Sequence, residues 1–316
     1  MSTVIGMDEA GYGPNLGPLV VTATAWDVEG DPTKIDFWAL LDGVVSQKAP
    51  RDKNRLHIAD SKKVYTPAKG IRELEKSVLC LLRLVGQKPQ TFQELRHFVT
   101  AGTEQGNSEA EPWFENADLP LPQVACPDEI EQTAQRLQSA CNEQGIRLKE
   151  IRSDVVLTER FNRLTTQYDS KGVTLSKISM GLIQSLWDPD AAEKTLVIAD
   201  KHGGRNRYDG LLDEILDGQM IFRLEEGTHL SNYRVGNAEV RFQTKAEAHF
   251  PVAVSSLFCK YLRELSMDLF NRFWCGHVPG LKPTKGYPVD AKRFRADVEL
   301  AKKELEINDQ IFWRSR

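Results

Sequence analysis

Residues 3–26 read TVIGMDEAGYGPNLGPLVVTATAW, and this stretch decides how the chain folds. Two apolar runs, at 3–7 and 19–26, are rich in Val, Ile, Thr and Ala, which is typical of buried strands. The segment between them is rich in Gly and Pro and predicts a turn. The stretch therefore predicts an antiparallel hairpin at the start of the chain.

The rest of the chain alternates helix-like and strand-like segments. Apolar residues at helical spacing predict helices at 67–84, 127–145, 174–187, 250–274 and 291–305. Short apolar runs predict strands at 147–157, 194–199, 220–224 and 239–244. The pattern decays between 86 and 127, where the polar stretch TEQGNSEAEP at 103–112 predicts a surface loop. The alternation predicts an α/β fold with a mixed central sheet flanked by helices.

The composition narrows the class of protein. The chain has 316 residues, of which 41% are apolar and 27% charged, and this excludes collagen-like, coiled-coil and wholly disordered chains. No apolar run approaches the roughly 20 residues that span a bilayer, and no signal-peptide pattern opens the chain, so we expect a cytoplasmic protein without a membrane partner. Five cysteines never form a C-x-x-C pair, so reduced thiols are expected and zinc-ligand spacing is lacking. The net charge is −4, so any phosphate binding must come from local basic patches.

Acidic residues follow two of the predicted strands. Asp8 and Glu9 are adjacent, and side chains alternate between the faces of a strand. We therefore expect Asp8 to end its strand and Glu9 to lie in the glycine-rich turn. Asp200 ends the run LVIAD and needs a partner if it is buried. A shared Mg²⁺ or Mn²⁺ ion would satisfy all three acids, although an acid at a strand end is more often a turn residue or a helix N-cap.

Five segments resemble, in order, the motifs of the type-2 ribonucleases H. The opening motif is similar to DEAGYGPNLGPLVVTA at 8–23. The others are DSKK at 60–63, VIAD at 197–200, KAEAHFPVAVSSLFCKYLRE at 245–264 and KGYPVD at 285–290. Because no extra domain precedes the first motif, we expect a type-2 and not a type-3 relative.

The resemblance implies a ribonuclease H-like fold that occupies 1–316 as one catalytic domain. An insertion is expected at about 86–145 and a C-terminal helical part at about 276–316. The implied activity is cleavage of the RNA strand of RNA–DNA hybrids, or at single ribonucleotides in duplex DNA, which leaves 3′-hydroxyl and 5′-phosphate ends. The implied catalytic and metal-binding residues, which would hold two Mg²⁺ or Mn²⁺ ions, are Asp8, Glu9, Asp200 and Glu247. No obligate protein partner is inferred.

The resemblance also implies which residues contact the substrate. The 2′-hydroxyl would be read by Gly11, Tyr12, Gly13 and Tyr287, of which the last is otherwise an ordinary turn aromatic. Phosphate would be contacted by Lys62 and Lys63, by Lys201 and Arg205, which with Arg207 form a basic loop, and by Lys245. The alternatives are a solvated Ser-Lys-Lys turn for Lys62 and Lys63, a flexible Gly-Gly loop for the basic loop, and a surface salt bridge for Lys245. For Ser255 and Ser256 we expect a structural role, and for Glu264 a pair with Lys260.

Three departures from the family pattern leave the substrate open. Tyr12 stands where the family has Arg, Glu247 stands where it has Asp, and VSSL at 254–257 stands where it has AASI. One alternative is therefore a nuclease of the same fold with a different structured nucleic-acid target. Another is a nucleic-acid-binding protein without catalysis, against which the four retained acids argue.

Overall fold

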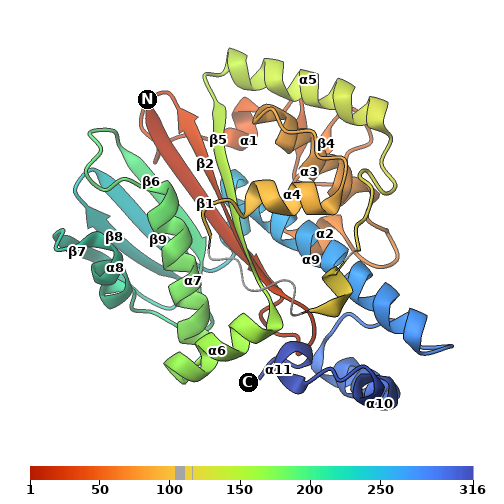
Figure 1. The fold of residues 1–316 in the computed structure, drawn as a ribbon. Coiled ribbons are helices and arrows are strands. Elements are labelled where there is room, and N and C mark those ends of the chain that lie inside the picture. The colour runs from red at the N-terminus through yellow and green to blue at the C-terminus, as the bar shows by residue number, and fades with distance from the viewer. Residues whose placement is uncertain (104–110, 116, 316) are drawn as a thin grey trace.

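The computed structural model describes residues 1–103, 111–115 and 117–315, and its centre is a twisted seven-stranded sheet (Figure 1). The strands lie in the order β5-β2-β1-β6-β9-β8-β7. Their bounds are β1 Ser2–Ala10, β2 Leu19–Val28, β5 Arg147–Val156, β6 Thr195–Asp200, β7 Ile221–Glu226, β8 Leu230–Val235 and β9 Ala238–Gln243. A separate pair joins β3 Val45–Ser46 to β4 Leu56–His57.

The sheet is mixed, as the sequence predicts. β1 and β2 form the expected antiparallel hairpin, and β5 extends it in the same antiparallel sense. β6 is parallel to β1, and β9 is parallel to β6. The β7–β8 hairpin continues the sheet beyond β9 with antiparallel pairing. Three antiparallel strands followed by two parallel to the first are the ribonuclease H-like arrangement, so the predicted fold class is confirmed.

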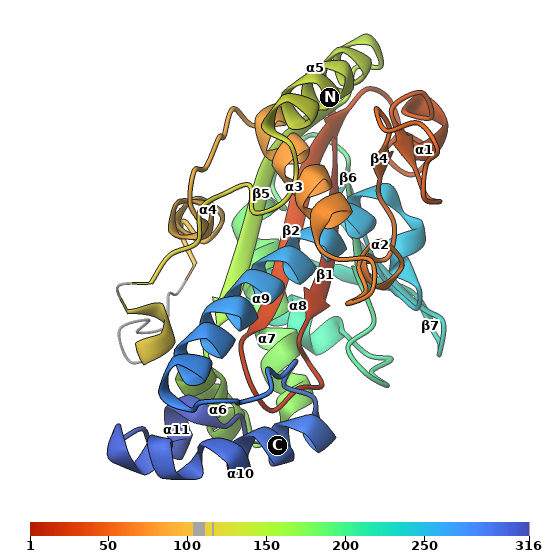
Figure 2. The same ribbon diagram turned by 90° about the vertical axis from the view of Figure 1, so that its right-hand side faces the viewer.

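Helices cover both faces of the sheet (Figure 2). Alternation along β1 sends Val4 to one face and Ile5 to the other, so the protein has two apolar clusters. The Val4 face is covered by α9 (Phe250–His277) and α3 (Arg72–Leu84). The Ile5 face is covered by α7 (Lys171–Leu186) and α8 (Asp209–Leu216).

The remaining helices surround these layers. They are α1 Phe37–Leu40, α2 Ser61–Val64, α4 Phe92–Val99, α5 Pro127–Glu143, α6 Thr158–Tyr168, α10 Pro288–Glu304 and α11 Asp309–Phe312. Short 3-10 turns occupy Pro112–Phe114 and Ala246–Ala248. Within the described part of the chain, none of these helices combines the length and apolar character that crossing a membrane requires.

Several elements differ from the prediction. The helix expected from residue 67 begins at Arg72, because the amides of Lys69 and Gly70 both bond the Thr66 carbonyl and form a turn first. β8, α4, α6 and α8 were not predicted, since each is short or carries a narrow apolar face. Most of the loop expected at 103–112 lies outside the described residues.

Candidate metal centre

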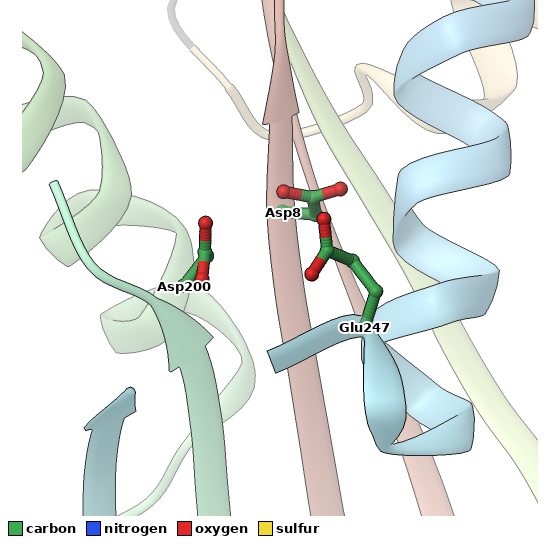
Figure 3. Close-up of side chains that lie close together, drawn as sticks. All are labelled: Asp8, Asp200 and Glu247. Atoms are coloured by element: carbon green, nitrogen blue, oxygen red, sulfur yellow. The ribbon is translucent and has the colours of Figure 1, made fainter. Parts of the chain in front are cut away.

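Three of the predicted acids meet at one end of the sheet (Figure 3). Each of Asp8, Asp200 and Glu247 offers a carboxylate oxygen, and the three oxygens lie within 4.8 Å of one another. Met7 pairs with Ala199 in the parallel β1–β6 ladder, so the next residue of each strand is an acid on the same face. The third acid comes from the 3-10 turn just before α9, the helix that packs on this face.

The cluster holds more negative charge than its surroundings offset. Burial, then the neighbouring Glu9, raises the pKa of Asp8 well above its usual range, and the Ser256 hydroxyl lowers it only in part. Burial also raises the pKa of Asp200, although the Ala246 amide donates to its Oδ1 at 3.4 Å. The pKa of Glu247 is likewise raised by burial. Carboxylates gathered in this way fit a divalent cation with hard oxygen ligands.

Glu9 does not lie where the sequence predicts. β1 continues through Ala10, and Glu9 pairs with Val21 in regular register, so the expectation that it lies in the turn is wrong. The turn begins later because Asp8 and Glu9 both keep antiparallel partners in β2. Alternation places Glu9 on the opposite face from Asp8, and its carboxylate is not in the group of three. Burial and the charge of Asp200 nevertheless raise its pKa to about 7, so it lies within the field of the cluster.

Lys62 lies beside the acids. It belongs to the short helix α2, whose N-cap Asp60 accepts its amide at 3.0 Å. Burial opposes its charge, but Asp60, Glu247 and Asp8 outweigh burial and raise its pKa. Lys63 is exposed, and its carbonyl accepts the Lys69 ammonium at 2.7 Å.

Lys201 is not directed at the cluster. Its side chain is buried, and its ammonium donates to Asn206 Oδ1 at 3.0 Å, the Gly227 carbonyl at 2.6 Å and Ser231 Oγ at 2.9 Å. A fourth bond reaches the carbonyl of Arg205 at 3.3 Å. Lys201 therefore anchors the loop after β6 to the β7–β8 hairpin, and the expectation that it contacts phosphate is corrected. In the same loop Arg205 is half-buried and the exposed Arg207 faces Glu226 at 3.7 Å.

The glycine-rich turn lies next to the cluster and to the second tyrosine. Gly11 has φ +89°, and a Cβ there would lie 2.6 Å from the Pro18 carbonyl, so glycine is required. Tyr12 is half-buried, and the Lys171 ammonium lies 4.6 Å from its ring centroid. The turn also receives the 284–287 segment, because the Asn15 amide donates to the Gly286 carbonyl at 2.8 Å. Tyr287, the exposed tyrosine of this segment, thus lies beside the turn. Gly13 belongs to the turn itself, where a Cβ would meet open space. The exposed Lys245 lies next to the acid cluster.

Two buried arginines support this turn. Arg263 donates to the Pro18 carbonyl at 2.6 Å, and Arg314 donates to the Gly11 carbonyl at 2.5 Å. Arg314 also stacks on Phe161, with its guanidinium carbon 4.0 Å from the ring centroid. Sequence reasoning missed both residues. Arg263 lies inside one of the motifs and could be found there, whereas Arg314 follows the apolar run IFW in a segment that belongs to no motif.

The serines and Glu264 behave as expected. Ser255 Oγ donates to the Gly6 carbonyl at 2.8 Å, and Ser256 Oγ accepts the Ser61 amide at 3.3 Å, so both join α9 to neighbouring segments. Glu264 pairs with Lys260 at 2.6 Å.

No family model and no curated protein matches the sequence. Among solved structures, the chain is similar to RNase HII from Archaeoglobus fulgidus in its complex with PCNA. The two chains share 14% identity, the match covers 99% of this chain and 94% of that one, and the TM-score is 0.43. Ribonuclease H2 of Pyrococcus horikoshii gives 14% identity, 98% and 92% coverage and a TM-score of 0.42. Bst-RNase HIII in complex with Mn²⁺ gives 16% identity, 99% and 66% coverage and a TM-score of 0.44. The solved proteins are of the class that the motifs resemble.

Proposed function

We propose that the protein is a metal-dependent endonuclease that cleaves the RNA strand of RNA–DNA hybrids, or single ribonucleotides embedded in duplex DNA. The observation that carries the proposal is the meeting of Asp8, Asp200 and Glu247 within 4.8 Å. They come from segments separated by about 50 to 190 residues, and the fold buries their charges at a cost that a bound cation would offset. The ordered motifs around them support the choice of substrate.

Each residue has a proposed part in the reaction. Asp8, Asp200 and Glu247 would hold Mg²⁺ or Mn²⁺. Glu9, which lies on the other face of β1 but within the field of Asp200, is the proposed fourth ligand. When bound, two divalent ions would activate water and stabilise the leaving oxygen, and the expected products carry 3′-hydroxyl and 5′-phosphate ends. Lys62 contacts the phosphate that the acids would otherwise repel. The remaining substrate contacts are proposed for Gly11, Tyr12, Gly13, Lys63, Arg205, Lys245 and Tyr287.

We place this activity in a single catalytic domain spanning residues 1–316, with an insertion at about 86–145. The five cysteines are unpaired, which supports the proposed cytoplasmic location.

The test is cleavage of a DNA duplex that contains one ribonucleotide, with the product ends mapped. We expect cleavage of the phosphodiester bond on the 5′ side of the ribonucleotide, which leaves a 3′-hydroxyl. The cleavage should depend on Mg²⁺ or Mn²⁺ and be abolished by EDTA. Asp8→Asn removes it, whereas Asp213→Asn, at an exposed acid of α8, serves as the matched control and keeps it. A substrate that stays intact with both metals at high enzyme concentration overturns the proposed specificity.

A second candidate keeps the chemistry and changes the target. The observation that favours it is at Tyr12, where the family has an arginine. The Tyr12 ring contacts the Lys171 ammonium, so the turn presents an aromatic ring in place of a guanidinium. Parallel assays on the hybrid, on double-stranded RNA and on branched DNA separate the two. A protein that binds nucleic acid without catalysis is the third candidate, and it predicts no stabilisation by Mg²⁺ or Mn²⁺.

A further inference from the structure

A hollow of about 210 Å³ lies on the α9 face of the sheet, near the metal centre. Its floor includes Ile198, two residues before Asp200, and its rim includes His249, two residues after Glu247. Two residues of a strand span about 6.6 Å, so the hollow borders the acid cluster.

An aromatic wall closes one side of the hollow. The Trp38 indole nitrogen donates to the Ala248 carbonyl at 2.7 Å, and its ring meets Phe250 edge to face at 5.2 Å. Asp36 caps α1 by accepting the Trp38 amide at 3.0 Å. These contacts hold the indole in place before any ligand arrives. A fixed aromatic ring at a nucleic-acid site is suited to stacking on a base.

Two nitrogen-bearing side chains also line the hollow. Arg241 donates from Nε to Glu239 at 2.7 Å, and its two terminal nitrogens make no hydrogen bond to the described residues. The His249 ring makes none within the described ranges either. The two ring nitrogens of His249 can hydrogen-bond the edge of a base. The guanidinium fork of Arg241 suits phosphate.

We propose that this hollow binds one nucleotide, with its base against Trp38, its edge at His249 and its phosphate on Arg241. Two sources share this chemistry: a free mononucleotide, or an unpaired nucleotide of a strand held at the metal centre. The second source rests on the proposed function, whereas the pocket itself does not.

The first experiment follows Trp38 directly. The protein is labelled with 5-fluorotryptophan, and the resonance lost in Trp38→Phe identifies Trp38 among the six tryptophans. Adenosine 5′-monophosphate is titrated in EDTA, with inorganic phosphate alone as the comparison. We expect a saturable shift of the Trp38 resonance with the nucleotide and none with phosphate.

Three variants test the polar contacts. His249→Ala and Arg241→Gln are each expected to weaken nucleotide binding about tenfold, the effect of losing about 1.4 kcal/mol. His97→Ala, at an exposed histidine of α4, is the matched control and binds like the parent. Circular dichroism checks that each variant is folded. An unmoved Trp38 resonance, an equal shift with phosphate alone, or folded variants that bind like the parent overturn the proposal.

The second experiment identifies the source. Asp8→Asn protein is mixed with a hybrid carrying one unpaired nucleotide, or with a fully paired hybrid. A Trp38 shift with the first duplex and none with the fully paired one identifies the strand as the source, whereas a shift with the mononucleotide alone identifies the free ligand. Cleavage by the parent protein without any Trp38 shift overturns the pocket and leaves the nuclease in place; a Trp38 shift in a parent protein that does not cleave does the reverse.

Discussion

The metal centre and the buried Glu75 of α3 are two ways of placing a carboxylate inside this protein. Glu75 is fully buried and accepts the amides of Gln123, Val124 and Ala125 at 2.6–2.7 Å, with the Tyr261 hydroxyl at 2.7 Å. Asp8 is also buried, but its neighbours include two further acids and its pKa is raised well above the usual range.

The contrast separates a structural acid from a functional one. At Glu75 the fold supplies four donors, so the carboxylate ties the 123–125 segment to α3 and α9 without help from outside. At Asp8 the fold supplies fewer donors than the acids need, which fits the proposed cation. Both residues are buried carboxylates, and their hydrogen-bond partners and neighbouring charges distinguish them.

The largest effect is expected for Asp8→Asn. Loss of one ligand removes charge stabilisation in the transition state, and we expect cleavage to fall about 1000-fold. The metal-free protein should be at least as stable as the parent, because one of several repelling acids is gone. Single-turnover cleavage and thermal unfolding in EDTA measure the two. A clear drop in metal-free stability would place Asp8 in the same class as Glu75.

Glu75→Ala should show the opposite pattern. Three amides and a hydroxyl lose their acceptor, and we expect a loss of about 4 kcal/mol in the free energy of unfolding, measured with urea. Tyr261→Phe, which removes one of the four donors, should cost about 1 kcal/mol. Cleavage per folded molecule should not change in either variant. A loss below that of Tyr261→Phe would show that Glu75 is not the anchor of this segment.

Glu111 tests an intermediate case. It accepts the Thr158 amide at 2.6 Å and the Trp113 indole nitrogen at 2.8 Å, yet burial raises its pKa to about 7. Because the folded protein binds this proton more tightly than the unfolded chain, stability is full below about pH 4.5 and falls as the pH rises towards 7. The loss is about 3 kcal/mol. Glu111→Gln should remove this part of the pH dependence in urea unfolding between pH 4 and 8, and an unchanged slope would contradict it.

Metal binding should change the stability less than the loss of Glu75 does. At a metal concentration 100 times the Kd, Mg²⁺ or Mn²⁺ should stabilise the folded protein by about 2.7 kcal/mol. Glu75→Gln, if folded, should keep this stabilisation, and Asp8→Asn should lose it. Differential scanning fluorimetry against metal concentration measures both, and equal responses would remove the distinction between the two acids.

The sequence predicts the three converging acids because each belongs to a motif and ends or follows a strand. It misplaces Glu9, because we expect a strand to end before it places a second acid on its other face. Here β1 keeps its register through Glu9, and the strand accommodates this acid with a pKa raised to about 7. Lys201 was misassigned because a basic loop gives no sign of the carbonyls that surround its ammonium.

The sheet order could be predicted in outline but not in full. β1, β2 and β6 carry apolar or β-branched runs and β9 alternates apolar with polar residues, whereas β8 reads LSNYRV and buries only its Ser, Tyr and Val side chains. Such a strand is recognised by its pairing with β9, which is a property of the assembled sheet and not of the segment.

The bond between Arg314 and the Gly11 carbonyl joins residues 303 positions apart in the chain. During synthesis the ribosome releases Gly11 long before Arg314, so the hairpin leaves the exit tunnel with its turn carbonyls still solvated. The turn acquires its final support only when the last helices have formed. All three acids of the cluster are therefore synthesised before the glycine-rich turn between β1 and β2 receives its last hydrogen-bond donor at residue 314.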